Sequence, residues 1–152
     1  MNHIKKLVLI TASVIFLSAC SSLMLSPAEF GWPIESVLKI DDKGVVKDDR
    51  YSLSFNTKAL FFDETQDSMA YSGKSLRMIR SSEGFYFMTA ENFKNVYVFS
   101  TDKNAFSLVN KLQINEASLK NPVFNQRPPF VELIDGGVSY KLTSEGFDGG
   151  KK

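Results

Sequence analysis

Residues 81–114 read "SSEGFYFMTAENFKNVYVFSTDKNAFSLVNKLQI", and in this stretch each of three short polar segments is followed by an apolar run. The polar segments are SSEG, ENFKN and TDKN. Gly, Ser, Asn and Asp between runs rich in Phe, Tyr and Val are typical of the turns that join antiparallel strands. We therefore predict three consecutive strands, at residues 85–89, 96–100 and 105–114.

The three predicted strands differ in the pattern of their apolar residues. The sequences FYFM (85–88) and VYVF (96–99) are apolar at every position, so both faces are expected to be buried and both strands to be central. In the third strand the alternation is expected to bring one set of side chains to a single buried face: Phe106, Leu108, Leu112 and Ile114.

The same kind of pattern extends in both directions along the chain. The segment RYSLSFN (50–56) alternates, with Tyr51, Leu53 and Phe55 expected on one face. Residues 34–40 and 45–47 are predicted to flank a turn at DDKG (41–44). Further strands are predicted at residues 75–80, 130–134 and 138–142, the last two as a hairpin around Asp135-Gly136-Gly137.

These segments predict an all-β fold. We expect a single antiparallel β-sandwich or a small β-barrel of about seven to nine strands, spanning residues 34–146 and followed by a flexible tail at 147–152. No window of 11–18 residues after the N-terminus has a helical period, so residues 59–62 are interpreted only as a short apolar run. The segment NEASLKN (115–121) has room for one helical turn.

Residues 115–129, NEASLKNPVFNQRPP, are predicted to form a long proline-rich loop. Loops of this length inside a compact domain are often functional. An aromatic side chain close to an arginine is a common composition of interface hot spots, so Phe124, Asn125, Gln126 and Arg127 are a candidate partner-binding loop. The interpretation that we favour is that the loop closes one end of the domain and Phe124 fills the core. In either case the adjacent prolines 128 and 129 place the segment at the end or edge of a sheet.

The N-terminus has the three zones of a secretory signal peptide. Lys5 and Lys6 are followed by an uncharged apolar run from Leu7 to Leu17 and then by small residues. The apolar run is shorter than the roughly 20 residues that a membrane-spanning helix needs. Residues 1–19 are therefore expected to be cleaved; the alternative is an uncleaved anchor.

The sequence Leu17-Ser18-Ala19-Cys20 resembles the lipobox of bacterial lipoproteins. The resemblance implies cleavage between Ala19 and Cys20, a diacylglycerol on the sulfur of Cys20 and acylation, for example by palmitate, of its new amino group. Such chains anchor a protein to a membrane without a transmembrane helix. Residues 20–33 then form a short tether. Its Phe30 and Trp32 either dock on the domain or lie in the membrane interface.

The residues after the cysteine carry sorting information in such lipoproteins. Ser21 stands where an aspartate would favour retention in the inner membrane, and the residues that follow contain no acid. By this resemblance the protein is expected on the periplasmic side of an outer membrane.

The composition excludes several classes of chemistry in the part of the chain after the cleavage site. The chain has one histidine, His3, and one cysteine, Cys20. Cleavage removes the first and lipidation consumes the second, which excludes Ser-His-Asp and Cys-His catalysis, zinc sites of Cys and His, and haem ligation by either. Removing Lys5 and Lys6 from 18 basic residues leaves 16 against 17 acidic ones, so no affinity for nucleic acid is expected.

Three further motifs are weak candidates for sites. SGKS (72–75) is similar to a phosphate-binding loop but has Ser68 where that loop needs glycine, so a turn is predicted. DDKGVVKDD (41–49) lacks the closing glutamate of a calcium loop and is interpreted as a solvated hairpin, with a weak cation site as the alternative. FFDETQD (61–67) carries paired carboxylates, as glycosidases do, but is interpreted as a solvated acidic loop. No metal, cofactor or catalytic residue is predicted.

The leading hypothesis from the sequence is a lipid-anchored envelope lipoprotein without catalytic activity. It would bind, hold or assemble another envelope protein. Two alternatives stay open: a small β-barrel that carries a hydrophobic ligand, since the chain has 13 Phe, and an inhibitor of an envelope-attacking enzyme.

Overall fold

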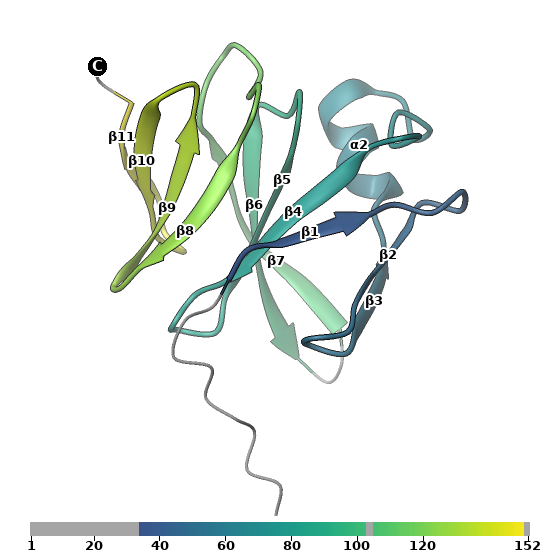
Figure 1. The fold of residues 1–152 in the computed structure, drawn as a ribbon, viewed down its shortest axis with the longest axis horizontal. Helices are drawn as coiled ribbons and strands as arrows, with labels where there is room; N and C mark the ends of the chain where they lie inside the picture. Colours follow the sequence, from purple (N-terminus) through teal and green to yellow (C-terminus); the bar gives the residue numbers. More distant parts are fainter. Residues whose placement is uncertain (1–33, 103–104, 151–152) are drawn as a thin grey trace, which may run out of the picture. The chain divides into compact units, whose positions relative to one another are not determined.

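The computed structural model describes residues 34–102 and 105–150, and it shows an all-β domain (Figure 1). Within this part of the chain there are eleven strands and one short helix, α2 (Lys58–Thr65). The strands are β1 (Ser36–Lys39), β2 (Val45–Asp48), β3 (Leu53–Asn56), β4 (Ser75–Arg80), β5 (Tyr86–Ala90), β6 (Asn95–Asp102), β7 (Ala105–Gln113), β8 (Val123–Arg127), β9 (Phe130–Asp135), β10 (Val138–Leu142) and β11 (Phe147–Gly149).

The largest sheet has five antiparallel strands in the order β1-β4-β5-β6-β7. β5 lies at its centre and is buried at every residue, and the first four residues of β6 are buried as well. The prediction that these two strands are central, apolar on both faces, is confirmed. Three of its five strands lie within residues 81–114, where β5, β6 and β7 pair as a consecutive antiparallel series.

The two faces of this sheet are covered by different elements. On one face the side chains of Met78, Tyr86, Met88 and Tyr97 pack with α2 and with the β2–β3 pair. On the other face Ile79, Phe87, Val96 and Val98 pack against a four-stranded sheet in the order β11-β10-β9-β8. Alternation along β5 explains both cores, since successive residues of a strand point to opposite faces.

The strand orders also decide between the two predicted architectures. In the part of the chain that the structure describes, no sheet closes on itself, so the sandwich is confirmed and the small barrel is wrong. The DDKG turn is present, with Gly44 at φ +81°, but it joins strands of different sheets. β1 pairs with β4, whereas β2 pairs with β3.

The single buried face expected for the strand at 105–114 is wrong. A β-bulge shifts the register between β6 and β7, so that Val98 is opposite Asn110 whereas Phe99 is opposite Leu108. Val109 is the extra residue. Because an extra residue reverses the alternation, Phe106 packs in the core on the α2 side, and Leu112 and Ile114 pack against the four-stranded sheet.

A helix occupies residues predicted to be only a short apolar run. In α2, Leu60 and Phe61 are buried, and the helix ends at Gln66, whose backbone is left-handed (φ 59°) and whose N–H donates to the carbonyl of Phe62. Eight residues are too few to show a helical period in a window of 11 or more. Its stability therefore depends on tertiary packing.

Two predictions for the C-terminal third are wrong. Residues 123–127 of the predicted loop form β8. Residues 147–149 of the predicted tail form β11, which pairs with β10. The prolines do act as expected, because Pro128 and Pro129 form the turn after β8, and β8 is an edge strand.

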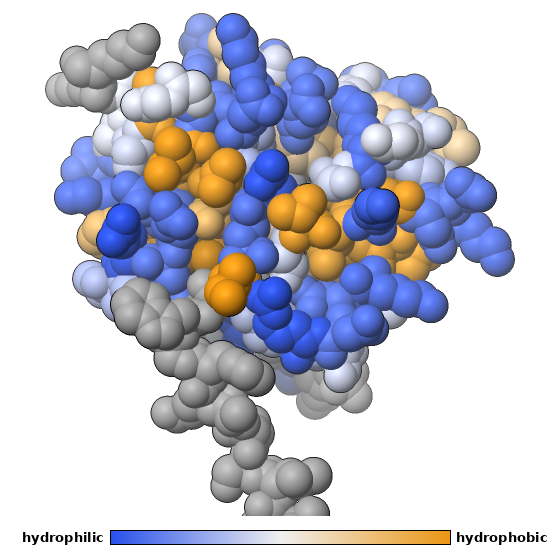
Figure 2. Space-filling model, viewed as in Figure 1, coloured by the Kyte–Doolittle hydropathy of each residue, from blue (hydrophilic) through white to orange (hydrophobic). Residues whose placement is uncertain are grey.

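Apolar side chains also reach the surface at strand edges. Figure 2 shows them in separate groups among polar residues on the face that carries β1 and β8. Ile34, Val37 and Val123 are exposed in these segments. Scattered exposure of this kind is normal for soluble domains. Among the described residues no helix has the length and apolar character needed to cross a membrane.

Candidate functional site: an aromatic groove between two strand edges

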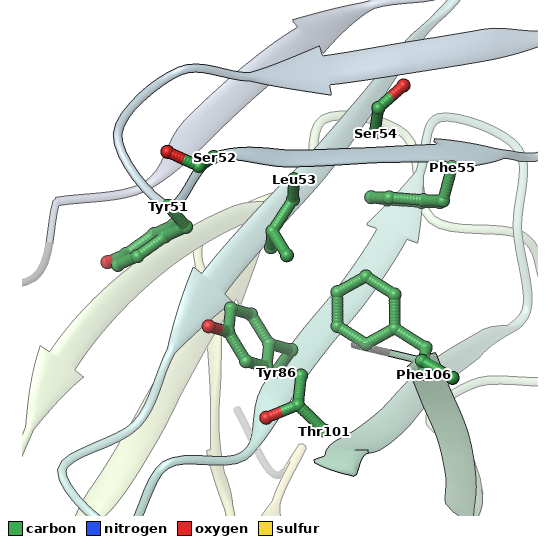
Figure 3. Close-up of a pocket in the computed structure, with 9 residues that line it drawn as sticks. Tyr51, Ser52, Leu53, Ser54, Phe55, Tyr86, Thr101 and Phe106 are labelled. Atoms are coloured by element: carbon green, nitrogen blue, oxygen red, sulfur yellow. The ribbon is translucent and has the colours of Figure 1, made fainter. Parts of the chain in front are cut away.

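A groove of about 930 Å³ lies between the β3 segment and residues of β5, β6 and β7 of the large sheet (Figure 3). Consecutive residues 51–55 line it from one side. Tyr86, Thr101, Ala105 and Phe106 line it from the other side. Its volume is in the range of about 300–1,000 Å³ that is usual for ligand sites.

Aromatic rings form the wall of the groove. Phe106 is the central ring, because it contacts Phe55, Tyr86 and Phe99 edge-to-face, at centroid distances of 5.0, 5.2 and 5.7 Å. Tyr51 meets Tyr86 in the same way at 5.7 Å. In Figure 3 Leu53 and Phe55 of β3, and Tyr51 just before it, point toward Tyr86 and Phe106, whereas Ser54 points away. Edge-to-face geometry fixes these rings relative to one another, so the groove wall is largely preformed.

The groove has a polar end and an apolar end. The two tyrosine rings lie at one end, and each has a guanidinium over it: Arg50 is 5.9 Å from the centroid of Tyr51, and Arg80 is 5.8 Å from that of Tyr86. Phe55 and Phe106 lie at the other end.

Charges near the tyrosine end act on Tyr86. Burial raises the pKa of Tyr86, the positive charge of Arg80 opposes this rise, and the negative charge of Asp48 adds to it. Asp48 is itself buried, and one of its oxygens accepts a hydrogen bond from the N–H of Arg50 at 2.8 Å. The hydroxyl of Tyr86 therefore stays protonated at neutral pH and is available as a hydrogen-bond donor.

A second polar cluster joins α2 to the large sheet. The hydroxyl of Tyr97 on β6 lies 2.5 Å from Oδ2 of Asp63 and 3.0 Å from Oε1 of Glu64, and Lys111 Nζ of β7 is 2.5 Å from the same Asp63 oxygen. Glu64 also accepts hydrogen bonds from the backbone N–H groups of Lys94 and Asn95. The acidic segment 61–67 is thus not a solvated loop: its two adjacent carboxylates lie on a helix and bind the sheet.

The pKa shifts in this cluster agree with a structural role. Burial raises the pKa of Tyr97 far above its ordinary value, and the hydrogen bond to Asp63 and the charge of Glu64 raise it further. Hydrogen bonds from Lys111 and Tyr97 lower the pKa of Asp63. At neutral pH the hydroxyl of Tyr97 therefore stays protonated and the carboxylate of Asp63 stays ionised, and the hydroxyl donates its hydrogen bond to this carboxylate.

The predicted partner-binding residues lie on β8 and are divided between its two faces. Phe124 is only 2 % exposed and packs in the core between the four-stranded sheet, to which it belongs, and the five-stranded sheet. Asn125 and Arg127 lie on the other face, where both donate to Glu132, at 3.4 and 3.3 Å. Gln126 is half-buried. Alternation along a strand therefore separates the aromatic from the arginine, and the four residues do not form one surface.

The remaining sequence candidates have simple outcomes. SGKS forms the predicted turn, with Gly73 at φ +71°. In DDKGVVKDD, Oδ1 of Asp41 accepts from the backbone N–H groups of Lys43 and Val45, so this carboxylate supports the turn. Within the described ranges no three acidic, His or Cys side chains gather as metal ligands would. Ala19 and Cys20, with residues 20–33, lie outside the described residues.

The sequence contained only part of the signal for the groove. The alternation in residues 50–56 places Tyr51, Leu53 and Phe55 on one face, but it does not show which strand they pack against. Comparison with known proteins adds no relative, since no family model, curated protein or solved structure matches the chain.

Proposed function

We propose that the protein is a lipid-anchored lipoprotein of a bacterial cell envelope whose β-domain binds another envelope component without catalysing a reaction. The observation that carries the proposal is the sequence Leu17-Ser18-Ala19-Cys20, which follows a positively charged start and an apolar run. We place the protein on the periplasmic side of an outer membrane, because no acidic residue follows Cys20 directly.

The domain supports a binding role in two ways. It carries a half-open groove whose wall is made of tyrosine and phenylalanine rings with arginines beside it, which are residue types enriched in binding hot spots. The chain after Cys20 contains neither histidine nor cysteine, the residues most used for nucleophilic and acid–base catalysis at neutral pH.

Metabolic labelling with a radioactive fatty acid tests the anchor. The wild-type chain is expected to incorporate label and to fractionate with outer membranes, and Cys20→Ala to remain an unlabelled, unprocessed precursor. Ser21→Ala is the matched control, because it changes the next residue and leaves the motif intact. Mass spectrometry that finds the same unacylated chain in wild type and Cys20→Ala would overturn the proposal.

A further inference from the structure

We propose that the groove is the docking site for an extended peptide segment of a partner protein, which adds as a strand to the free edge of β3. This inference rests on the proposed binding function and names the chemistry of the partner. Two features carry it: β3 and β7 each have an edge without a neighbour in the described part of the chain, and the β3 segment lines one side of the aromatic groove.

The first feature is the pair of open edges. β7 is the last strand of the five-stranded sheet, and β3 is one of only two strands in its sheet. β2 follows β1 through the turn at residues 41–44, and the N–H of Asp41 donates to the carbonyl of Val45 at 3.0 Å. The β2–β3 pair thus folds over the large sheet and brings Phe55 of β3 against Phe106 of β7. Residues 51–55 therefore form one side of the groove, and residues of β5, β6 and β7 form the other.

The backbone of β3 is oriented to pair with an added strand. The N–H of Thr57 donates to the carbonyl of Gly44 at 2.8 Å, and the register continues with Val45 opposite Asn56 and Lys47 opposite Ser54. Because hydrogen-bonded and non-hydrogen-bonded pairs alternate in an antiparallel ladder, Ser54 belongs to a non-hydrogen-bonded pair. Its N–H and C=O therefore point away from β2, toward the free edge.

The lining residues agree with this orientation. A face of a strand exposes every second residue, whereas the groove is lined by five consecutive residues of the β3 segment, from Tyr51 to Phe55. Consecutive lining residues indicate that the edge, with its backbone groups, borders the groove. Free edges of this kind are templates for strand addition, and proteins usually cover them.

The size and charge of the groove define the peptide. A strand residue occupies roughly 160 Å³, from a rise of about 3.3 Å, a strand spacing of about 4.8 Å and a sheet spacing of about 10 Å. The groove of about 930 Å³ therefore has room for about five or six residues. At the tyrosine end the two guanidinium groups of Arg50 and Arg80 outnumber the buried carboxylate of Asp48, so the segment should carry an acidic residue there and an apolar side chain at the Phe55–Phe106 end. It should lack proline, which cannot donate to β3.

Site-specific photocrosslinking in cells that produce the full-length protein tests the site. A photoreactive residue replaces Ala105, which is exposed and lines the groove, and in a control chain it replaces Ser139, which is exposed on β10. Mass spectrometry of the adduct identifies the crosslinked segment. The expected segment has an acidic residue and alternating apolar residues, and the control position does not capture it.

A pair of substitutions then separates backbone pairing from general contact. Ser54→Pro removes the outward N–H without removing a bond to β2, whereas Ser54→Ala keeps it. The full-length protein is expected to bind a synthetic copy of the crosslinked segment. Its affinity should fall at least about tenfold in Ser54→Pro and stay within about twofold in Ser54→Ala. The melting temperatures of both variants should match that of the wild type, which shows that the difference in affinity does not come from unfolding.

Several results would overturn the inference. These are no adduct at residue 105, an adduct with lipid only, a crosslinked segment that is helical in its own protein, or equal affinity in the two Ser54 variants. Such a failure differs from failure of the proposed function. If residue 139 captures a partner and residue 105 does not, the protein binds elsewhere; if Cys20 is not acylated, the anchor itself is wrong.

Discussion

Glu35 and Phe124 are joined by a hydrogen bond although 89 positions separate them in the chain. The backbone N–H of Phe124 donates to Oε1 of Glu35 at 3.0 Å, and Oε2 of Glu35 forms an ion pair with Arg77 at 2.8 Å. Glu35 precedes β1 at the edge of the large sheet, and Phe124 lies in β8 at the edge of the four-stranded sheet. One carboxylate therefore connects the edges of the two sheets, and burial raises its pKa.

Replacing Glu35 should weaken this connection. Glu35→Ala leaves the N–H of Phe124 and the guanidinium of Arg77 without their partner, so the free energy of unfolding is expected to fall by about 1–3 kcal/mol. Urea denaturation measures the change. Glu83→Ala, in the exposed turn at residues 81–84, is the control and should cost under about 0.5 kcal/mol. Equal costs for the two variants would contradict a linking role for Glu35.

Truncation of Phe124 tests whether this side chain belongs to the core or to a partner surface. Because its ring is buried in the core between the two sheets, Phe124→Ala is expected to cost about 3–5 kcal/mol of stability. Val123→Ala removes a neighbouring side chain that is 38 % exposed and should cost under about 1 kcal/mol. Thermal melting of both variants distinguishes them. A nearly unchanged melt for Phe124→Ala would show that its ring is free for recognition.

Removal of one hydroxyl should loosen α2. Tyr97→Phe deprives Asp63 and Glu64 of a shared donor in a partly buried position, and the expected cost is about 1–3 kcal/mol. The rate of hydrogen exchange at the amides of residues 58–65 should rise by the factor that corresponds to this free energy. Tyr140→Phe is the matched control, since the Tyr140 hydroxyl has no hydrogen bond within the described part of the chain. If both variants exchange at the wild-type rate, the cluster does not hold the helix.

The shifted pKa of Asp63 predicts a pH dependence with a defined sign. Its pKa in the folded state is below the ordinary value of 3.8, because the carboxylate accepts hydrogen bonds from Lys111 and Tyr97. The unfolded chain therefore binds this proton first, and the stabilisation is fully present above about pH 4 and is lost as the pH falls through the folded pKa. Asp63→Asn should be less stable than wild type at pH 7, and the difference should shrink in acid. Melting curves from pH 2 to pH 7 measure it; a constant difference would contradict the assignment.

Local patterns were sufficient for the strands that carry the fold. Continuous apolar runs at residues 85–88 and 96–99 indicate burial on both faces of a strand, and the alternation at residues 50–56 indicates burial on one face. Both patterns can be recognised because successive side chains of a strand point to opposite faces. The edge position of residues 123–127 followed from the two prolines after them, because proline has no backbone N–H to donate to a neighbouring strand. The motif at residues 17–20 is likewise local, which is why it supports a proposal on its own.

Other features depended on contacts that no local pattern contains. The bulge at Val109 reversed the faces of β7, and the sequence does not mark it because both faces of the sheet are covered: Phe106 is buried on one face and Leu112 on the other. The helix at residues 58–65 is too short to be stable alone, and it forms because Phe61 is buried and because Tyr97 and Lys94 bind its carboxylates from strands about thirty residues away.

The sequence by itself determined that this chain forms an all-β domain behind a lipobox-like N-terminus, because side-chain burial and short motifs are encoded residue by residue. Only the tertiary structure decided that β2 and β3 leave β1 and fold over the large sheet. This arrangement brings Phe55 to Phe106 and creates the groove between the β3 segment and the large sheet. The physical reason is that a sequence pattern indicates which side chains are buried, whereas long-range packing determines which residues those side chains contact.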